Sequence, residues 1–555
     1  MEDVGRGWKF AHLPAASPGD LYRFALPDGT TTPDPASRFQ PQDVHGPSMI
    51  VDHDSYCWRC VDWVGRPWNE TILYELHIGS FTPQGTFRSA AARLPHLKSL
   101  GVTAIEIMPV ADFAGARNWG YDGAFPFAPD STYGAPDDFK FFVDEAHRFG
   151  MSVILDVVYN HFGPDGAYMG LYASNFFSPA QQTPWGAGIN FDGQCSLHVR
   201  RFYLENALYW LEAYRLDGLR FDAIHAIPDA SRRHILHEIA REIRTRIART
   251  HIHLIIENEE NESRFLDGSE RLTAQWNDDV HHVLHVAATD ERSGYYADYI
   301  HDTDMLGRAL TEGFAFQGQH MPYRNKARGT KSRHLAPTRF VSFIQNHDQI
   351  GNRAKGERLN SLCAPERLKA IAAIYLLLPQ IPMLFMGEEW GASSPFQFFC
   401  GFEGELAEAV RTGRRAEFAR FPEYAKAPPE AIPDPTEPAT FERSKLDWNE
   451  IDSEPHADWL ALYRSLISLR SRRVVPLLPT LLHGGTYSIL GHLAVEAEWT
   501  DEAGPVLLLQ ANLGSVVTAF QPRVGFQQIY PGQNIEVERL APFSVAWSIV
   551  SSTDA

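Results

Sequence analysis

Four groups of polar side chains stand where short apolar runs of the sequence end. The stretch 156–161 (Asp-Val-Val-Tyr-Asn-His) and the stretch 217–222 (Asp-Gly-Leu-Arg-Phe-Asp) close two of these runs. Glu257 closes a third, and 346–348 (Asn-His-Asp) stands at the end of a fourth. A single strand-end aspartate is usually a helix N-cap or a turn residue. Carboxyl groups that converge from several strands can instead serve as nucleophile and proton donor in one active site.

The elements that would bring these groups together are predicted from Ile72 onward, where short apolar runs alternate with helical periods. This alternation is typical of βαβ units and a parallel sheet. Eight cycles occur, with candidate strands near 72–77, 102–108, 153–158, 218–221, 253–256, 272–276, 340–344 and 382–385. We therefore predict an α/β fold, a (β/α)8 TIM barrel whose active-site rim is formed by the C-terminal strand ends.

The barrel is expected to share the chain with two smaller β domains. Residues 1–66 are rich in Pro, Gly, Asp and aromatics with short alternating runs, and are predicted to form a partial N-terminal β-sandwich-like domain. The catalytic barrel is predicted over 67–473, with an insertion at about 162–197 and an irregular segment at about 401–450. Alternating apolar runs then predict a C-terminal β-sandwich domain over 474–555.

Composition indicates an ordinary globular protein with a neutral ligand. The 50 Lys and Arg residues against 69 Asp and Glu give a net charge of −19, which disfavours nucleic acid and anionic membranes as partners. Neither a leader with a basic and then an apolar region nor an apolar run of membrane-spanning length is present. Five cysteines form an odd, sparse set that fits a reducing compartment. We expect a cytoplasmic protein that binds neither nucleic acid nor membrane.

The four strand-end motifs resemble those of the α-amylase superfamily of glycoside hydrolases. Its conserved regions read D-x-V-x-N-H, G-x-R-x-D-A, a strand-end Glu, and N-H-D, and all four occur here in that order. Each motif alone is weak, whereas the set is specific, and the resemblance extends over roughly residues 65–550. It implies a retaining glycosidase with Asp222, Glu257 and Asp348 as the catalytic carboxylates.

The resemblance also implies a role for each carboxylate. Asp222 matches the nucleophile, and Arg220, two residues back on the same strand face, would keep it ionised. Glu257 matches the acid and base, because burial after an apolar run raises a carboxyl pKa, whereas Glu259 and its acidic neighbours suit a solvated loop. Asp348 would bind sugar hydroxyls and stabilise the oxocarbenium-like transition state.

Further residues match substrate contacts of the superfamily. His161 resembles the histidine that binds the 6-hydroxyl of the reacting sugar, with a structural histidine as the alternative. Tyr121 resembles the aromatic platform under that sugar, with a core tyrosine as the alternative. Asn160 matches a calcium ligand in many amylases, but no set of partner carboxylates is evident near it. We predict no required metal and no cofactor.

Flanking sequence is similar to one family of the superfamily, the maltooligosyltrehalose trehalohydrolases. The resemblance rests on four segments, 74–83, 275–282, 345–358 and 385–391. It implies hydrolysis of the α-1,4 bond that joins a maltooligosyl chain to a terminal trehalose, with release of trehalose. The implied partners are maltooligosyltrehalose as substrate and a maltooligosyltrehalose synthase that acts before this enzyme.

Several polar residues around the motifs are expected to bind this substrate. The cluster after the sixth strand would bind trehalose hydroxyls, with a structural hydrogen-bond network as the alternative. His225, three residues after the nucleophile, resembles a ligand to the leaving sugar. The full set of predicted substrate-binding residues is Tyr121, His161, Arg220, His225, Asp278, Asp279, His281, His282, His347, Gln349 and Asn352.

Two departures and three alternatives accompany this interpretation. The family usually carries a full N-terminal β-sandwich, and we expect only its last part to precede the barrel here. Around 399–402 the family's usual polar residues are replaced, which affects the subsite contacts expected there. A glycogen branching enzyme or a general α-amylase would use the same carboxylates. A non-catalytic amylase-like binding scaffold typically loses one of them, and this chain keeps all three.

Overall fold

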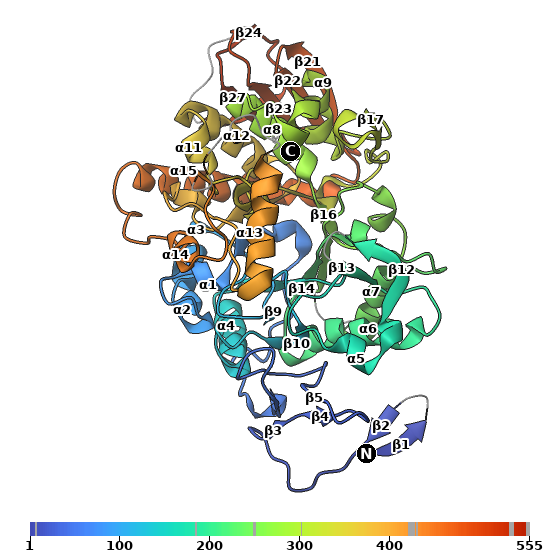
Figure 1. Ribbon diagram of the computed structural model, residues 1–555. Helices are drawn as coiled ribbons and strands as arrows, with labels where there is room; N and C mark the ends of the chain where they lie inside the picture. The colour runs from blue at the N-terminus through green and yellow to red at the C-terminus, as the bar shows by residue number, and fades with distance from the viewer. Residues whose placement is uncertain are drawn as a thin grey trace.

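The computed structural model describes residues 1–5, 8–183, 186–247, 251–300, 302–419, 424, 428, 431–531 and 538–550. Its centre is a closed barrel of eight parallel strands (Figure 1). The barrel strands are β7 (Leu73–Leu76), β8 (Ala104–Ile107), β11 (Ser152–Val157), β14 (Gly218–Phe221), β15 (His253–Ile256), β16 (Ala274–Trp276), β19 (Phe340–Ser342) and β20 (Ile381–Phe385). All eight coincide with the expected segments, so the predicted (β/α)8 barrel is confirmed.

The barrel interior has an apolar layer below a polar one. A separate apolar cluster is contributed by seven of the strands and by Phe343 just after β19, and it consists of Leu73, Ala104, Ile154, Ile255, Ala274, Trp276, Val341, Phe343, Ile381 and Met383. Residues two apart in a strand share a face. Glu75, Glu106 and Asp156 therefore point to the same side as the apolar residues two positions before them, one layer nearer the C-terminal strand ends. The polar layer lies directly under the predicted rim.

Helices link the strands around the outside of the barrel (Figure 1). The longer ones are α3 (Leu94–Leu100), α4 (Pro136–Arg148), α6 (Ser196–Ala213), α7 (Ile235–Arg246), α8 (Asp278–Thr289), α9 (Thr303–Glu312), α12 (Pro365–Leu377) and α15 (His456–Leu469). Short helices also occur: α1 (Ile78–Phe81), α2 (Phe87–Ala91), α10 (His347–Gly351) and α11 (Leu359–Leu362). Within the described part of the chain, none of the helices is long and apolar enough to cross a membrane.

Two segments that follow barrel strands carry elements of their own. The insertion at about 162–197 contains α5 (Met169–Tyr172) and the antiparallel pair β12 (Phe177–Thr183) and β13 (Gly186–Ile189). The segment 401–450, expected to be irregular, contains α13 (Gly404–Phe418) and α14 (Pro438–Arg443). In Figure 1, α13 stands across the front of the barrel.

The N-terminal strands and the C-terminal sheet lie at opposite ends of the molecule (Figure 1). The C-terminal part forms a five-stranded antiparallel sheet in the order β21 (Thr486–Gly491), β22 (Ala494–Asp501), β23 (Gly504–Asn512), β27 (Ser544–Val550), β25 (Phe526–Tyr530), beside the pair β24 (Thr518–Ala519) and β26 (Arg539–Leu540). The N-terminal part forms short pairs: β1 (Glu2–Gly5) with β2 (Trp8–Phe10), β3 (Leu21–Tyr22) with β6 (Ser48–Met49), and β4 (Phe24–Ala25) with β5 (Thr31–Thr32). The described N-terminal strands are thus paired in twos.

Two further short strand pairs lie in the connections of the barrel. β9 (Ala111–Asp112) pairs with β10 (Phe125–Pro129) before α4, and β17 (His320–Met321) pairs with β18 (Lys326–Ala327).

A buried arginine joins the last barrel helices to the final barrel strand. Arg470 follows α15 directly and is fully buried. Its guanidinium donates to the carbonyl oxygens of Leu376 and Leu378 at the end of α12, at 3.1 and 2.5 Å. It also donates to the carbonyl of Gln380, one residue before β20, at 2.7 Å. The last carbonyls of a helix have no partner within the helix, and Arg470 donates to two of them at the end of α12.

We expect Arg470→Met to destabilise the barrel. The methionine fills much of the volume but leaves three buried carbonyl groups without a charged donor, at a cost of about 3 kcal/mol. Thermal unfolding monitored by circular dichroism should show a midpoint several degrees lower. Arg472→Met, at an exposed position in the same turn, should leave the midpoint unchanged, and equal effects of both changes would contradict this assignment.

Candidate active site

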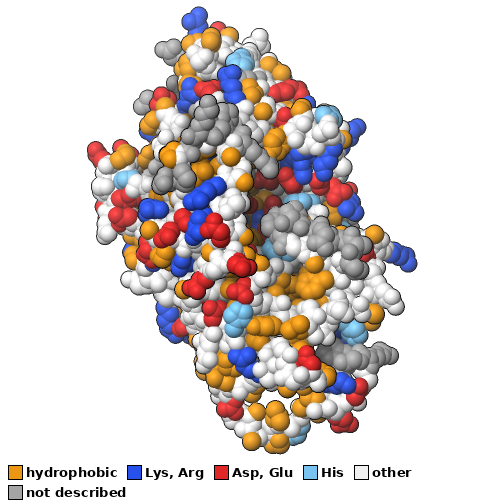
Figure 2. Space-filling model, in the orientation of Figure 1, with side chains coloured by type: hydrophobic (Ala, Val, Ile, Leu, Met, Phe, Trp, Pro, Cys, Tyr) orange, Lys and Arg blue, Asp and Glu red, His pale blue; other side chains and the backbone are white. Residues whose placement is uncertain are grey.

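A cavity of about 490 Å³ opens at the C-terminal ends of the barrel strands. Asp222, Glu257 and Asp348 all line it, as do Tyr121 and His161. Figure 2 shows a recess with acidic side chains at the middle of the molecule, beside the position of α13 in Figure 1. The structure therefore brings the three carboxylates predicted from separate motifs to one hollow surface.

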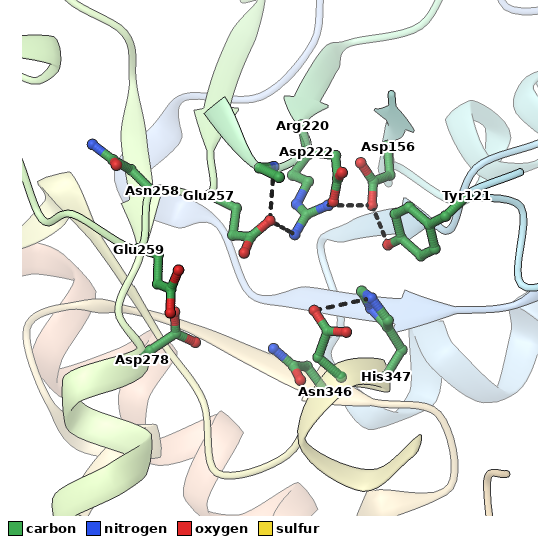
Figure 3. A network of polar contacts seen from close by, with 12 residues as sticks. Tyr121, Asp156, Arg220, Asp222, Glu257, Asn258, Glu259, Asp278, Asn346 and His347 are labelled. Carbon is green, nitrogen blue, oxygen red and sulfur yellow. Dashed lines mark hydrogen bonds and ion pairs between the residues drawn. The ribbon is translucent and has the colours of Figure 1, made fainter. Parts of the chain in front are cut away.

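A single guanidinium links the carboxyl groups at the base of this cavity. Arg220 is fully buried, and its Nη1 donates to Asp222 Oδ1 at 2.8 Å and to Asp156 Oδ2 at 2.7 Å. Its Nη2 donates to Glu257 Oε2 at 3.1 Å (Figure 3). Retaining glycosidases hold their two carboxyl groups about 5 to 5.5 Å apart. Two carboxyl groups bound to neighbouring nitrogens of one guanidinium are compatible with that spacing.

The strand register explains why one arginine reaches all three groups. Parallel pairing of β11 with β14 sets Asp156 level with Arg220, and pairing of β14 with β15 sets Arg220 level with Ile255, two residues before Glu257. Asp222 lies two residues after Arg220, so its side chain points to the same face. The face of the guanidinium rests on the Trp276 ring, with 4.0 Å between Cζ and the ring centroid.

Burial prepares Glu257 to hold a proton. Removal from water raises the pKa of its carboxyl well above the usual range, and Arg220 only partly opposes this. The negative charges of Asp222 and Asp348 raise the Glu257 pKa further. Its Oε2 accepts a hydrogen bond of 2.8 Å from the backbone N–H of Ala223. A protonated carboxyl at this position can donate to a leaving oxygen.

Asp348 has the opposite electrostatics. Burial alone would raise its pKa, but the neighbouring His347 more than offsets this, and the pKa of Asp348 lies below its usual value. His347 Nε2 lies 3.3 Å from Asp348 Oδ2, and Asn352 Nδ2 donates to Oδ1 at 3.1 Å. Within the same cavity, burial thus favours the protonated form of Glu257, and the neighbouring His347 favours the ionised form of Asp348.

In Figure 3, Tyr121 lies on the side of the site opposite Glu259 and Asp278. The Tyr121 hydroxyl donates to Asp156 Oδ2 at 2.6 Å, which holds the Tyr121 side chain beside the end of β11 (Figure 3). The preceding Gly120 has φ +105°, and a Cβ there would lie 2.0 Å from the Pro109 carbonyl oxygen. Only glycine fits this approach. His161 Nε2 faces the Tyr121 carbonyl oxygen at 3.0 Å.

Asn160 contacts the nucleophile candidate. Its Nδ2 donates to Asp222 Oδ2 and to the Asp222 carbonyl, both at 3.0 Å, and its Oδ1 faces His161 Nδ1. Among the described residues, no group of three or more His, Cys, Asp or Glu side chains is arranged to hold a metal ion. The amide of Asn160 is engaged in orienting the carboxylate.

A second cavity of about 220 Å³ adjoins the first and shares Glu257, Glu259, Asp348 and Asn352 with it. Its other walls include the predicted residues Asp278, His282 and Gln349, together with Tyr295, Tyr299, Met321, Tyr323, Arg324 and Arg328. Burial raises the pKa of Asp278 to about 7, with the charge of Asp348 adding to the effect. Gln349 Nε2 donates to Asp278 Oδ1 at 3.3 Å. This cavity is polar and reaches the catalytic carboxyl groups.

Asp279 and His281, predicted to bind substrate, lie outside both cavity linings. The Asp279 carboxylate accepts from Arg328 Nη1 at 2.5 Å, Tyr299 hydroxyl at 2.6 Å and the Ala315 backbone N–H at 2.7 Å. Both ring nitrogens of His281 also have protein partners, the Ile344 carbonyl and the Tyr296 hydroxyl. This placement favours the alternative role, a structural hydrogen-bond network.

His225 stands where the first cavity meets a neighbouring groove. It lines the 490 Å³ cavity and also a groove of about 550 Å³ that continues past Asp229 and Arg264. His225 Nε2 lies 3.5 Å from Glu259 Oε2, and burial lowers the His225 pKa. This geometry is compatible with the predicted contact between His225 and the leaving sugar.

Sequence patterns missed several residues of the site. The long segment between α8 and β19 has no motif of its own, yet it provides Tyr295, Tyr299 and Arg328. These side chains reach the cavity only because this connection folds back over the barrel. Arg414 on α13 and Phe398 line the first cavity. Arg414 Nη2 donates to the Gly351 carbonyl at 2.7 Å, which fixes α13 against α10. The helical spacing of residues 404–418 is the sequence pattern from which this wall of the cavity could have been predicted.

Comparison with known proteins gives one consistent result. Residues 33–183 match the family described as "Alpha amylase, catalytic domain". The malto-oligosyltrehalose trehalohydrolase of Deinococcus radiodurans is 44% identical over 472 residues, covering 85% of this chain and 77% of the relative. The enzyme of the same name from Saccharolobus solfataricus is 42% identical, covering 85% and 81%. A crystal structure of a candidate alpha amylase from Salmonella typhimurium superposes with a TM-score of 0.92 at 46% identity, covering 97% of this chain and 92% of that one.

The proton-donor geometry of Glu257 gives a direct test. We expect Glu257→Gln to lower kcat on an α-glucosidic substrate by about 10²- to 10⁴-fold, because no proton reaches the leaving oxygen. An α-glucosyl fluoride needs no such proton, so its first step should persist, and added azide should restore its turnover. Asp222→Asn serves as the matched control: azide can act there only in place of the nucleophile and would give the inverted β-glucosyl azide, whereas Glu257→Gln should give the retained α-glucosyl azide.

The raised pKa of Glu257 sets the expected pH dependence. Glu257 must be protonated to act, so kcat/KM should stay high at neutral pH and fall as pH rises through the raised Glu257 pKa. In Glu257→Gln assayed with the fluoride substrate, that alkaline fall should disappear. An unchanged alkaline limb would assign the titration to another group.

Proposed function

Because this chain belongs to the malto-oligosyltrehalose trehalohydrolase family of the α-amylase superfamily, we propose that it releases trehalose from maltooligosyltrehalose. The bond cleaved is the α-1,4 bond next to the terminal trehalose, and configuration is retained. The observation that carries this proposal is the Arg220 guanidinium, which holds Asp222 and Glu257 together where two polar cavities meet.

The proposed reaction has two steps. Asp222 attacks the anomeric carbon from one side while Glu257 gives its proton to the leaving oxygen. The glycosidic bond breaks, and a covalent glucosyl ester with Asp222 forms as trehalose departs. Glu257, now ionised, takes a proton from water, and that water breaks the ester to regenerate both carboxyl groups.

Neighbouring residues would stabilise the charge that develops on the sugar ring. Asp348 is ionised and faces the same cavity, so its negative charge would oppose the oxocarbenium character of the transition state. Tyr121 would stack against the reacting sugar, and His161 and His347 would bind its hydroxyls. Arg220 would lose part of its charge balance when Asp222 forms the ester, which favours the return of the carboxylate.

The second cavity is the proposed site of the trehalose unit. Asp278 and His282 line it four residues apart on one face of α8, and Gln349 and Asn352 face them from α10 and the residue after it. Such groups can bind several hydroxyls of a non-reducing disaccharide. A site built to pair these hydroxyls rejects ligands that leave its buried polar groups unpaired.

The remaining partner and the location are also proposals. A maltooligosyltrehalose synthase would supply the substrate, because a trehalose-ended glucan must be formed before it can be cut. The five cysteines are free thiols, which supports a reducing, cytoplasmic setting.

The product assay tests this function. Incubation with maltooligosyltrehalose should yield trehalose and a maltooligosaccharide shortened accordingly, detected by chromatography. Release of glucose or maltose alone would indicate a general α-amylase, and formation of new α-1,6 branches would indicate a branching enzyme. Asp222→Asn, assayed in parallel, should give none of these products.

Two adjacent aspartates allow a matched test of the trehalose site. We expect Asp278→Asn to lower kcat/KM for the trehalose-ended substrate relative to a maltooligosaccharide of equal length by about tenfold, the value of one lost charge-assisted hydrogen bond. Its unfolding temperature should match the parent. Asp279→Asn should instead lower the unfolding temperature, because Asp279 pairs with buried Arg328. An unchanged preference in Asp278→Asn would remove Asp278 from the site.

A further inference from the structure

Glu75 is a buried carboxylate that lies behind the site and lines neither cavity. It belongs to β7, in the polar layer of the barrel interior. Its Oε2 accepts the backbone N–H of His347 at 3.0 Å, and its Oε1 lies 2.5 Å from His347 Nδ1. Glu75 therefore binds both the backbone and the ring of one active-site residue.

The other ring nitrogen of His347 faces the catalytic cavity. Nε2 lies 3.3 Å from Asp348 Oδ2, so the ring stands between two carboxylates. A neutral imidazole carries one N–H and can donate to only one of them, whereas the imidazolium donates to both. Both carboxylates are therefore paired only when His347 is charged.

Aromatic rings fix the plane of His347. Tyr121 stacks on it with 5.0 Å between ring centroids and 25° between planes. Trp119 lies edge-on at 5.5 Å, and Trp276 is tilted at 5.9 Å. These neighbours hold the ring plane between the two carboxylates, and in this orientation the protonation state of His347 decides which bonds it makes.

Among the titratable groups described around His347, Glu75 provides the negative charge on the side of the barrel interior. Glu106 on the next strand has both carboxyl oxygens buried without a partner, and burial together with the charge of Glu75 raises its pKa well above the usual range. Burial lowers the pKa of His77 to about 4, so this ring is neutral. Asp348 faces His347 from α10, and the Tyr121 hydroxyl is bound to Asp156.

We propose that Glu75 is a positioning residue for the hydrolytic reaction: it keeps His347 doubly protonated, and His347 in turn fixes the ionised Asp348 against the transition state. This inference rests on the proposed role of Asp348 in α-glucan hydrolysis. Glu75 touches no substrate and acts through the ring. Without its charge, His347 would lose a proton in the working pH range, and Asp348 would lose its ring donor.

The pH profile separates this role from a structural one. His347 is active when protonated, and Glu75 and Asp348 together raise its pKa well above the usual value despite burial. Loss of the Glu75 charge lowers that pKa, so in Glu75→Gln His347 should lose its proton at a lower pH than the Glu257 titration that limits the parent, and activity should disappear there as pH rises. We expect Glu75→Gln to move the alkaline limb of kcat down by at least one pH unit, with kcat approaching the parent value at the acidic end.

Glu106→Gln is the matched control, since it makes the same change at a buried carboxyl on the neighbouring strand. Glu106 has no hydrogen bond to His347, and burial favours its protonated form, so the pH profile of Glu106→Gln should match that of the parent. The assay uses whichever α-glucan the parent hydrolyses, so failure to release trehalose would contradict the proposed function without touching this inference. A uniform loss of kcat at all pH values in Glu75→Gln would overturn it.

A measurement on the unaltered enzyme keeps the inference testable if Glu75→Gln folds poorly. In enzyme labelled with ¹⁵N at histidine, the His347 signals, identified by their loss in His347→Gln, should show both ring nitrogens protonated between pH 6 and 8. A neutral tautomer of His347 in that range would exclude the proposed role of Glu75, whatever the activity of the variants.

Discussion

The active site depends on one buried cation, the Arg220 guanidinium. Burying a charge is costly unless hydrogen-bonded countercharges surround it. Asp156 and Asp222 provide two, and Glu257 is a third hydrogen-bond acceptor. The arginine stabilises the carboxyl groups in turn, because a carboxylate buried in the barrel without a partner would also be destabilising. The Trp276 ring closes one face of the guanidinium and keeps water away. The position of the reacting pair is therefore a consequence of how the barrel neutralises its own interior.

The carboxyl groups of the barrel mouth fall into two classes according to their donors. Asp348 and Glu75 each have a partner on His347. Glu106 has no partner, and burial favours its protonated form. Glu257 lies between these cases: one oxygen is bound to Arg220 and Ala223, yet burial still raises its pKa. A group that must both give and take a proton requires such an intermediate environment.

Sequence patterns predicted the strands and the strand-end carboxylates because both depend on local order. A short apolar run fixes a strand, and the residue after it must lie at the rim. The same reasoning could not separate Asp278 from Asp279, because both begin one helix. Helical spacing offered a partial signal: Asp278 and His282 are four apart and share a face, whereas Asp279 is turned toward Arg328. Arg328 itself lies 49 residues further on, and no local pattern carries such a contact.

The link between nucleophile and acid runs through backbone as well as side chains. Ala223 directly follows Asp222 and has φ +40°, in the left-handed region that a residue with a Cβ enters at a cost of about 1 to 2 kcal/mol. That conformation directs the Ala223 N–H to Glu257 Oε2 at 2.8 Å, and the next N–H, of Ile224, donates to the Glu257 carbonyl at 3.0 Å. The strained turn therefore holds the acid by both its side chain and its backbone, while Arg220 holds the two carboxyl groups from below. Two independent constraints set the same separation, so relaxation of the turn would move Glu257 relative to Asp222 even if the guanidinium stayed in place.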